Sequence, residues 1–112
     1  MIKYDQRLTG VNQELVDAVK YASTKIGCNI LIVCGLRTIE EQEALFKKGA
    51  SKVKGNNSPH VLGKALDIVC LDEDGKCLWD DVKLFERLRK LISEKCKIKP
   101  LIIWDRNHFQ LE

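Results

Sequence analysis

The sequence has no apolar stretch long enough to cross a membrane, which takes about 20 consecutive apolar residues. Its first residues, Met1 to Arg7, lack the apolar core of a secretion signal, so we expect synthesis in the cytoplasm and no membrane span. The excess of positive charge is small, with 19 Lys and Arg against 16 Asp and Glu, which gives a net charge of +3. That excess is too small to indicate a nucleic-acid-binding protein.

The five cysteines include no Cys-x-x-Cys pair, and their number is odd. Both facts argue against a disulfide scaffold and against a cysteine-rich zinc site. Cys34 and Cys70 lie in apolar runs, where free cysteine behaves as a small hydrophobe. Internal repeats and linkers are also missing. With 45% hydrophobic and 31% charged residues, the 112 positions are expected to form a single domain, residues 1–112.

The first half of the chain shows one clear helical pattern and one apolar run. Apolar residues recur at intervals of three and four over residues 9–26, which predicts an amphipathic helix. Asn12 is the expected N-cap, and Gly27 is expected just past the end. Residues 29–34 are continuously apolar and rich in β-branched side chains, so they predict a buried strand.

A second helix is predicted directly after that strand. Thr38 and Glu41 have the spacing of a capping box, and the helix is expected to run to about Lys48. Arg37 therefore lies at a junction between a strand and a helix, where side chains commonly face a site. Residues 50–59 are polar and rich in turn formers, which predicts a long loop of the kind that is often functional.

The second half alternates apolar runs with turn formers. A helix is predicted from Asp80, as N-cap, to about Lys95, and a hairpin turn at residues 72–75. The expected strands are residues 64–71, 76–79, 101–104 and 108–111. This order of elements predicts an α+β fold, in which helices pack on a small central, mostly antiparallel sheet.

The sequence contains only two histidines, His60 and His108. Asp67 stands in an otherwise apolar predicted strand, and a buried carboxylate is costly unless it is paired or binds a metal. An ion pair with an arginine would also explain Asp67, and each histidine alone is more often a surface residue. Together, two imidazoles and a carboxylate would give zinc three ligands and leave one position for water. Zinc lowers the pKa of such water to about 7.

Hydrolysis also needs a proton acceptor and a group that neutralises the developing oxyanion. Asp105 precedes His108 by three residues and would reach a water at the metal, although Asp-Arg-Asn is also an ordinary turn sequence. Arg37 is the candidate for the oxyanion, although a salt bridge to one of the 16 acidic residues would explain it equally well.

These motifs resemble a known family. The pattern Ser-x-His-x-x-Gly-x-Ala-x-Asp over residues 58–67, followed by Asp-x-x-His over residues 105–108, is similar to the zinc peptidases that cut peptidoglycan cross-link peptides. That family includes D-Ala-D-Ala carboxypeptidases and dipeptidases, and the L-alanyl-D-glutamate endopeptidases of phage endolysins. Gly-x-Arg-Thr over residues 35–38, with Gln42, resembles the second signature of the family. Three separated motifs in the same order are a specific match.

The resemblance implies a D-Ala-D-Ala carboxypeptidase-like α+β fold and a Zn²⁺ cofactor held by His60, Asp67 and His108. The sequence departs from the family in two places. Residues 99–103 replace a glycine-rich approach to the last tryptophan, and Asn107 stands where many members have proline. These departures bear on the substrate pocket more than on the metal site, because all three ligand positions are filled.

The resemblance also implies roles in catalysis. Asp105 would act as general base and then as general acid, and Arg37 would polarise the scissile carbonyl. Ser58 and Gln42 would bind substrate. The expected function is hydrolysis of an amide bond in the peptidoglycan stem peptide by a monomeric zinc metallopeptidase, most similar to the L-alanyl-D-glutamate endopeptidases, that acts on the cell wall once released.

Three alternatives remain at this point. A D-Ala-D-Ala carboxypeptidase or dipeptidase would use the same chemistry on another bond. A non-catalytic, zinc-stabilised wall-binding module would need neither Asp105 nor Arg37. A nucleic-acid binder would use the lysines at positions 47, 48, 52 and 54, but these lack interleaved aromatic residues and are expected to form a solvated face.

Overall fold

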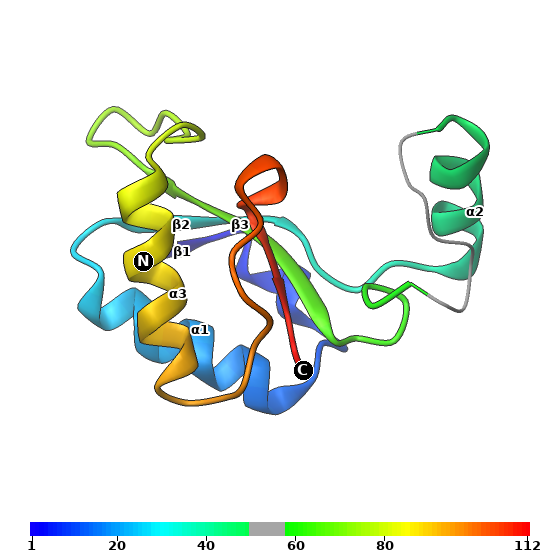
Figure 1. Ribbon diagram of the computed structural model, residues 1–112, viewed down its shortest axis with the longest axis horizontal. Helices are drawn as coiled ribbons and strands as arrows, with labels where there is room; N and C mark the ends of the chain where they lie inside the picture. Colours follow the sequence, from blue (N-terminus) through cyan, green and yellow to red (C-terminus); the bar gives the residue numbers. More distant parts are fainter. Residues whose placement is uncertain (50–57) are drawn as a thin grey trace.

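The computed structural model describes residues 1–49 and 58–112 (Figure 1). Four strands form one sheet in the order β1-β2-β3-β4. Their bounds are Ile2–Lys3 for β1, Asn29–Cys34 for β2, Ala65–Leu71 for β3 and His108–Gln110 for β4. The helices are α1 (Gln13–Lys25), α2 (Ile39–Lys47) and α3 (Val82–Ser93), with short 3-10 helices η1 (Asp5–Leu8) and η3 (Ile103–Asp105).

The sheet is mixed but mostly antiparallel. β1 runs parallel to β2, whereas β2 with β3 and β3 with β4 are antiparallel pairs. The α+β class and the mostly antiparallel sheet predicted from the sequence are therefore confirmed. The two-residue strand β1 was not predicted, because so short a segment carries no alternating pattern.

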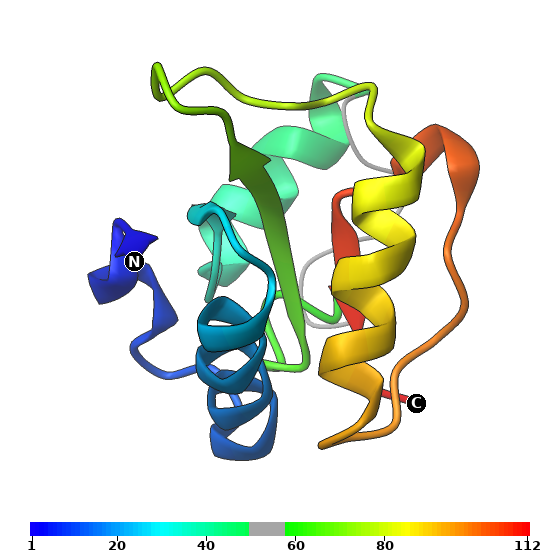
Figure 2. The same cartoon turned by 90° about the vertical axis from the view of Figure 1, so that its left-hand side faces the viewer.

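Helices α1 and α3 lie side by side against the sheet (Figure 2), whereas α2 stands apart from both, beyond one end of the sheet (Figure 1). The core forms where α1 and α3 meet the sheet, and it joins buried apolar residues of both helices with buried residues of the strands. Ile30 and Ile32 of β2, Leu66 and Ile68 of β3, and Phe109 of β4 are all fully buried in this core.

The predicted helix ends agree closely with the structure. The Asn12 side chain accepts a hydrogen bond from the Glu14 amide at the start of α1, and Gly27 has a positive φ of 83° just past its end. The capping box of α2 is present, with the Thr38 and Glu41 side chains each bonded to the other's backbone amide. The cap of α3 is Asp81, whose carboxylate accepts the Leu84 amide, and not Asp80 as predicted.

Two predicted strands are wrong. Residues 101–104 do not form a strand: Ile103 begins η3, and Trp104 is 83% exposed. Residues 76–79 contribute only an isolated bridge between Cys77 and Leu71, although the preceding hairpin turn is present, with the Asp72 amide donating to the Lys76 carbonyl. An apolar run becomes a strand only where a neighbouring strand edge and a core face are both available to it.

The long loop predicted over residues 50–59 falls mostly outside the described residues, as do Lys52 and Lys54. All five cysteines lie among the described residues, and none of them forms a disulfide in the structure. In the part of the chain that the structure describes, no helix has the length and apolar character needed to cross a membrane.

Candidate metal centre

The face of the sheet turned away from α1 and α3 carries a row of polar side chains. Successive residues of a strand point to opposite faces, so Asp67 points away from the core that Leu66 and Ile68 enter. Asp67 pairs with His108 across the antiparallel β3–β4 ladder. Directly paired residues share a face, which brings the His108 ring beside the Asp67 carboxylate.

Cys34 joins the same row because of an irregularity in β2. Ile32 pairs with Ile68, but the register then shifts so that Cys34 pairs with Asp67. In a regular strand Cys34 would share the core face of Ile32, two residues earlier. One extra residue in β2 therefore turns Cys34 over to the face of Asp67.

His60 reaches this row from a tight turn that precedes β3. The His60 carbonyl accepts the backbone amides of Arg37 and Gly63, which ties the turn to the segment after β2. Gly63 has φ 70° and lies so close to Gly10 that a Cβ would be 2.9 Å from the Gly10 oxygen. The turn thereby holds the His60 ring in a buried position between β2 and β3.

Both imidazoles use one ring nitrogen for support and turn the other toward Asp67. His60 Nδ1 lies 3.0 Å from the Gly35 carbonyl oxygen, and His108 Nε2 lies 2.9 Å from Gln110 Oε1. These oxygens only accept hydrogen bonds, so each supporting nitrogen carries its proton. In the neutral rings, the lone pairs of His60 Nε2 and His108 Nδ1 then face the carboxylate.

The distances at the centre fit a small cation. His60 Nε2 is 3.3 Å from Asp67 Oδ2, and His108 Nδ1 is 3.1 Å from Asp67 Oδ1. Two ligand atoms, each about 2.0–2.1 Å from a tetrahedral zinc, lie about 3.3–3.4 Å from one another. Two lone pairs facing one carboxylate repel unless a proton or a metal ion lies between them. His60, Asp67 and Cys34 place ligand atoms within 4.8 Å of one another, and His108 adjoins this group through Asp67 Oδ1. The residues present therefore fit a metal site, with carbonyl groups orienting both rings from behind.

The electrostatics of the three groups point the same way. Burial opposes ionisation of Asp67, but hydrogen bonds from both histidines outweigh it and lower the pKa of its carboxyl to about 2. Burial also opposes charging of His60, but its contacts with Asp67 and Cys34 raise its pKa to about 9. The pKa of His108 is raised as well, because Asp67 and Gln110 outweigh burial. An ionised carboxylate in a half-buried site thus attracts positive charge.

Arg37 extends the cluster beyond the three candidate ligands. Its Nη1 donates to Gln42 Oε1 at 2.6 Å, and its Nη2 lies 3.2 Å from Cys34 Sγ and 4.0 Å from Asp67 Oδ2. Gln42 is fully buried, so Arg37 is held by a fixed partner. Burial tends to raise the pKa of the Cys34 thiol, but His60 and Arg37 together lower it.

The other two predicted site residues, Asp105 and Ser58, lie within three residues of His108 and His60 in the sequence. Asp105 ends η3, three residues before His108, and among the described residues its carboxylate has no hydrogen-bond or ion-pair partner. Ser58 is buried at the start of the His60 turn, and its carbonyl accepts the Leu62 amide. No hydrogen bond joins the Ser58 hydroxyl to His60, Asp67 or His108.

Sequence reasoning missed two residues at this centre. Cys34 was interpreted as a core residue, and only the register shift in β2 reveals otherwise. Arg89 of α3 donates to the His108 carbonyl at 2.9 Å and lies over the Phe109 ring at 4.4 Å, so it fixes β4 from the core side. The helical pattern of α3 gave no sign of this contact, because it joins residues 19 positions apart.

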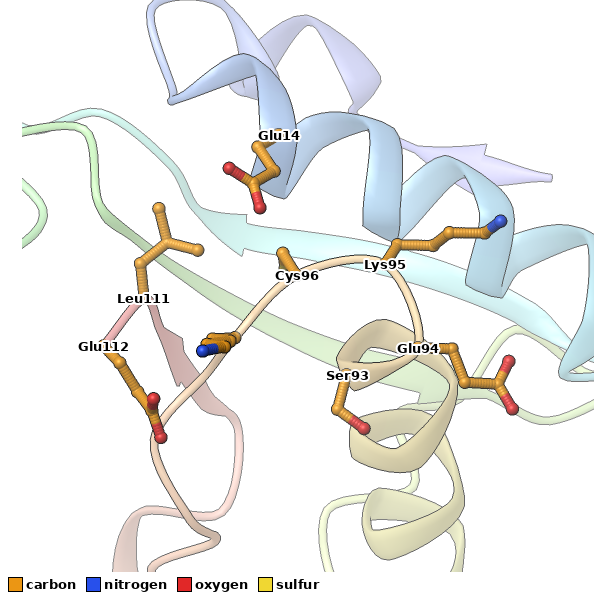
Figure 3. A pocket seen from close by; sticks show the side chains of 8 residues that line it. Glu14, Ser93, Glu94, Lys95, Cys96, Leu111 and Glu112 are labelled. Carbon is orange, nitrogen blue, oxygen red and sulfur yellow. The ribbon is translucent and has the colours of Figure 1, made fainter.

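A separate open pocket of about 490 Å³ lies between α1, the end of α3 and the C-terminal residues (Figure 3). Its lining mixes charges of both signs, including Glu14, Lys95 and Glu112, with the Cys96 thiol. None of its lining residues belongs to the histidine and aspartate cluster. The pocket is therefore not part of the candidate metal centre.

Comparison with known proteins gives a consistent result. Residues 2–104 match the family described as phage L-alanyl-D-glutamate peptidase. The chain is 34% identical over 71 residues to the peptidoglycan L-alanyl-D-glutamate endopeptidase CwlK of Bacillus subtilis, a match that covers 57% of this chain and 42% of CwlK. The chain thus spans less than half the length of this curated relative.

Among solved structures, the fold is similar to that of the L-Ala D-Glu endopeptidase ChiX of Serratia marcescens. The TM-score is 0.82, and the match covers 100% of this chain and 90% of ChiX. Sequence identity is 20%, so this likeness establishes the fold alone. It confirms the α+β architecture predicted from the sequence.

Proposed function

This chain belongs to the phage L-alanyl-D-glutamate peptidase family, and on that premise we propose that it is a zinc-dependent endopeptidase of peptidoglycan. The bond it would hydrolyse joins L-alanine to D-glutamate in the stem peptide, the specificity named for the relatives CwlK and ChiX. The catalytic machinery would be His60, Asp67 and His108 as metal ligands, with Arg37 and Asp105 acting on substrate and protons.

One observation carries the proposal. The supporting nitrogens of both histidines are committed to carbonyl oxygens, and their other nitrogens converge on the two oxygens of Asp67 at 3.3 and 3.1 Å. A simple ion pair would need only one such contact. Two imidazoles oriented in this way around one carboxylate support a three-ligand metal site.

When bound, zinc supplies Lewis acidity that activates water and polarises a carbonyl. Asp105 is the proposed general base, because its carboxylate has no partner among the described residues and lies in the short helix that leads into His108. It would take the proton of the attacking water and pass it to the leaving amine. The Arg37 guanidinium, held by Gln42, would stabilise the negative charge that develops on the carbonyl oxygen.

Digestion of purified peptidoglycan tests this function. We expect the protein to generate new D-glutamate amino termini and new L-alanine carboxyl termini, identified by mass spectrometry of the released fragments. A chelator should abolish cleavage, and added zinc should restore it. Asp67→Ala serves as the matched inactive control, because it removes the carboxylate on which both rings converge.

Other outcomes of the same digestion distinguish the alternatives. Release of D-alanine or of D-Ala-D-Ala would indicate a carboxypeptidase or dipeptidase on the same metal site. Wall binding that depends on metal, without any new termini, would indicate a binding module. Cleavage that persists fully in the presence of chelator would overturn the metal-dependent mechanism.

A further inference from the structure

We propose that Cys34 is a fourth protein ligand at this metal centre, so that the resting site holds its ion with two imidazoles, one carboxylate and one thiolate. The inference rests on the metal site of the proposed function. Cys34 Sγ, a ring nitrogen of His60 and a carboxylate oxygen of Asp67 all lie within 4.8 Å of one another. Cysteine sulfur is a preferred zinc donor, with a bond of about 2.3 Å.

The register shift in β2 places this thiol beside Asp67. Without the register shift between Ile32 and Cys34, the Cys34 side chain would enter the apolar core beside Ile32. The shift places it opposite Asp67, on the polar face. β-Bulges commonly re-aim one side chain next to a functional site. The shift takes the small Cys34 side chain off the core face, and Val33 packs against the core beside it.

The position of Cys34 complements that of His108. The two residues lie on β2 and β4, the neighbours of β3 on either side, and both pair with Asp67. His108 contacts Asp67 through Oδ1, whereas His60 contacts it through Oδ2. A thiolate would therefore approach Asp67 from the β2 side, opposite to His108 on the β4 side.

Arg37 supports a thiolate at this position. Its Nη2 lies 3.2 Å from the sulfur, so a guanidinium N–H donates to Cys34 from outside the ligand set. On metal binding the thiol proton passes to solvent, because the thiolate is the form that ligates. Cys34 is half-buried, and it lines an open hollow of about 380 Å³ together with Gly35 and Arg7.

The proposal has a consequence for the reaction. Four protein ligands complete the tetrahedral shell of zinc, as in structural sites, whereas hydrolysis requires an open position. The site would therefore rest closed, and a catalytic water would enter when Cys34 leaves or when the coordination expands to five. A soft sulfur donor would also favour zinc over magnesium or calcium.

Cobalt substitution tests the proposal by its spectrum and does not depend on activity. A thiolate bound to Co²⁺ gives an intense charge-transfer band in the near ultraviolet, in addition to the visible d–d bands of any tetrahedral cobalt site. We expect the wild-type chain loaded with Co²⁺ to show both. Cys34→Ser should lose the charge-transfer band and keep the d–d bands. Cys77→Ser, a half-buried cysteine outside the cluster, should leave the spectrum unchanged.

The outcomes distinguish ligation by Cys34 from the existence of the metal site itself. Tetrahedral d–d bands without a charge-transfer band in the wild type would overturn Cys34 ligation and leave the three-ligand site standing. Persistence of the band in Cys34→Ser would likewise overturn it. No cobalt spectrum at all would remove the metal site itself.

Alkylation of the wild-type protein gives a second test that needs no substitution. We expect zinc to protect Cys34, and not Cys77, from a thiol-alkylating reagent, as mapped by peptide mass spectrometry. Equal labelling of Cys34 with and without zinc would contradict the proposal even if Cys34→Ser failed to fold.

Discussion

His60 and His108 face Asp67 with different ring nitrogens, Nε2 for His60 and Nδ1 for His108. The difference follows from their supports, because Gly35 holds His60 through Nδ1 and Gln110 holds His108 through Nε2. A support fixes which nitrogen carries the proton, and this choice leaves the other nitrogen free to ligate. The residue chemistry of the site is therefore set by its outer contacts as much as by the ligands.

Replacing a candidate ligand should remove the metal. For His60→Ala we expect the bound zinc to fall from one equivalent toward none and hydrolysis to be lost with it, because the ion loses one of its two imidazole ligands, and that ring is the buried one. Metal analysis of the dialysed protein measures the first effect directly. An unchanged zinc content in this variant would remove His60 from the ligand set.

Replacing the proposed base should separate metal binding from turnover. For Asp105→Asn we expect zinc content to be retained, because Asp105 is not among the converging ligand atoms. The hydrolysis rate should fall about 10²–10⁴-fold, the usual contribution of a general base. Rates on purified peptidoglycan and metal analysis of the same sample provide both readings. Full activity would assign the proton transfer to another group.

At the residue scale, the sequence predicted those site residues that are recognisable by residue type alone. Two scarce histidines and an aspartate in an apolar strand indicated the cluster that the structure brings together, and their roles as ligands stay a prediction. Cys34 could not be found in that way. It continues the alternation of Ile30 and Ile32, so its period places it in the core, and only the paired strand shows the shift.

At the scale of elements, β4 is a three-residue strand at the edge of the sheet, yet it carries His108. Its attachment comes from two sides. The ladder to β3 holds its backbone, and Arg89 of α3 donates to the His108 carbonyl and lies over the Phe109 ring. The position of His108 therefore depends on a side chain from the opposite face of the sheet.

Removing this anchor should loosen β4. For Arg89→Met we expect the free energy of unfolding to fall by about 1.5–3 kcal/mol, the range for hydrogen bonds from a charged group, and zinc affinity to fall with it. Arg87→Met is the matched control, because Arg87 of the same helix also donates to a backbone carbonyl, that of Lys25, but at the exposed surface and away from β4, so its effect should stay within about 0.5 kcal/mol. Urea unfolding measures both, and equal effects would deny Arg89 this role.

Gly35 is a second point at which one residue positions an element. A Cβ there would lie 1.8 Å from the Arg7 carbonyl oxygen, so Gly35→Ala would push η1 and the segment after β2 apart. We expect a loss of stability at or above about 3 kcal/mol, and weaker zinc binding because the Gly35 carbonyl supports His60.

Gly27→Ala is the control for this substitution. Gly27, at the end of α1, has open space around it, and a side chain there meets only the strain of its positive φ of 83°. Its loss should be about 1–2 kcal/mol, from backbone strain alone, without an effect on zinc. Thermal unfolding and zinc titration of both variants would show the difference, and a harmless Gly35→Ala would contradict the close approach.

The elements that sequence analysis predicted well have local causes. The caps of α1 and α2 are made by residues within three positions of the helix start, and so their sequence signatures are sufficient. The strand predicted at residues 101–104 failed for a non-local reason. Its apolar side chains, up to Trp104, face solvent and not a sheet, and nothing in a short apolar run distinguishes the two cases.

At the scale of the whole molecule, the sheet separates the hydrophobic core from the candidate metal centre. One face packs against α1 and α3 and forms the core, whereas the other carries the polar row of Cys34, Asp67 and His108. The core contains none of the candidate ligands. The fold should therefore not depend on the metal for its existence, unlike small domains whose folding is driven by zinc.

Removal of the metal should accordingly lower stability without unfolding the chain. In the presence of zinc at about 100 times its dissociation constant, binding adds about 2.7 kcal/mol to the free energy of unfolding. We expect a chelator to lower the melting temperature by several degrees and to leave the far-ultraviolet circular dichroism unchanged at 25 °C. Unfolding on chelation would show that the metal is structural, and an unchanged melting temperature would show that none was bound.

The polar row crosses three neighbouring strands at a single level, with Asp67 as its middle member. Sliding any one of these strands by a single residue would send its contribution to the opposite side of the sheet. A molecule threaded wrongly by one position could therefore not capture the ion. Metal binding would thus stabilise only the molecules in which all three strands have the correct register, and it would shift a mixture of registers toward that one.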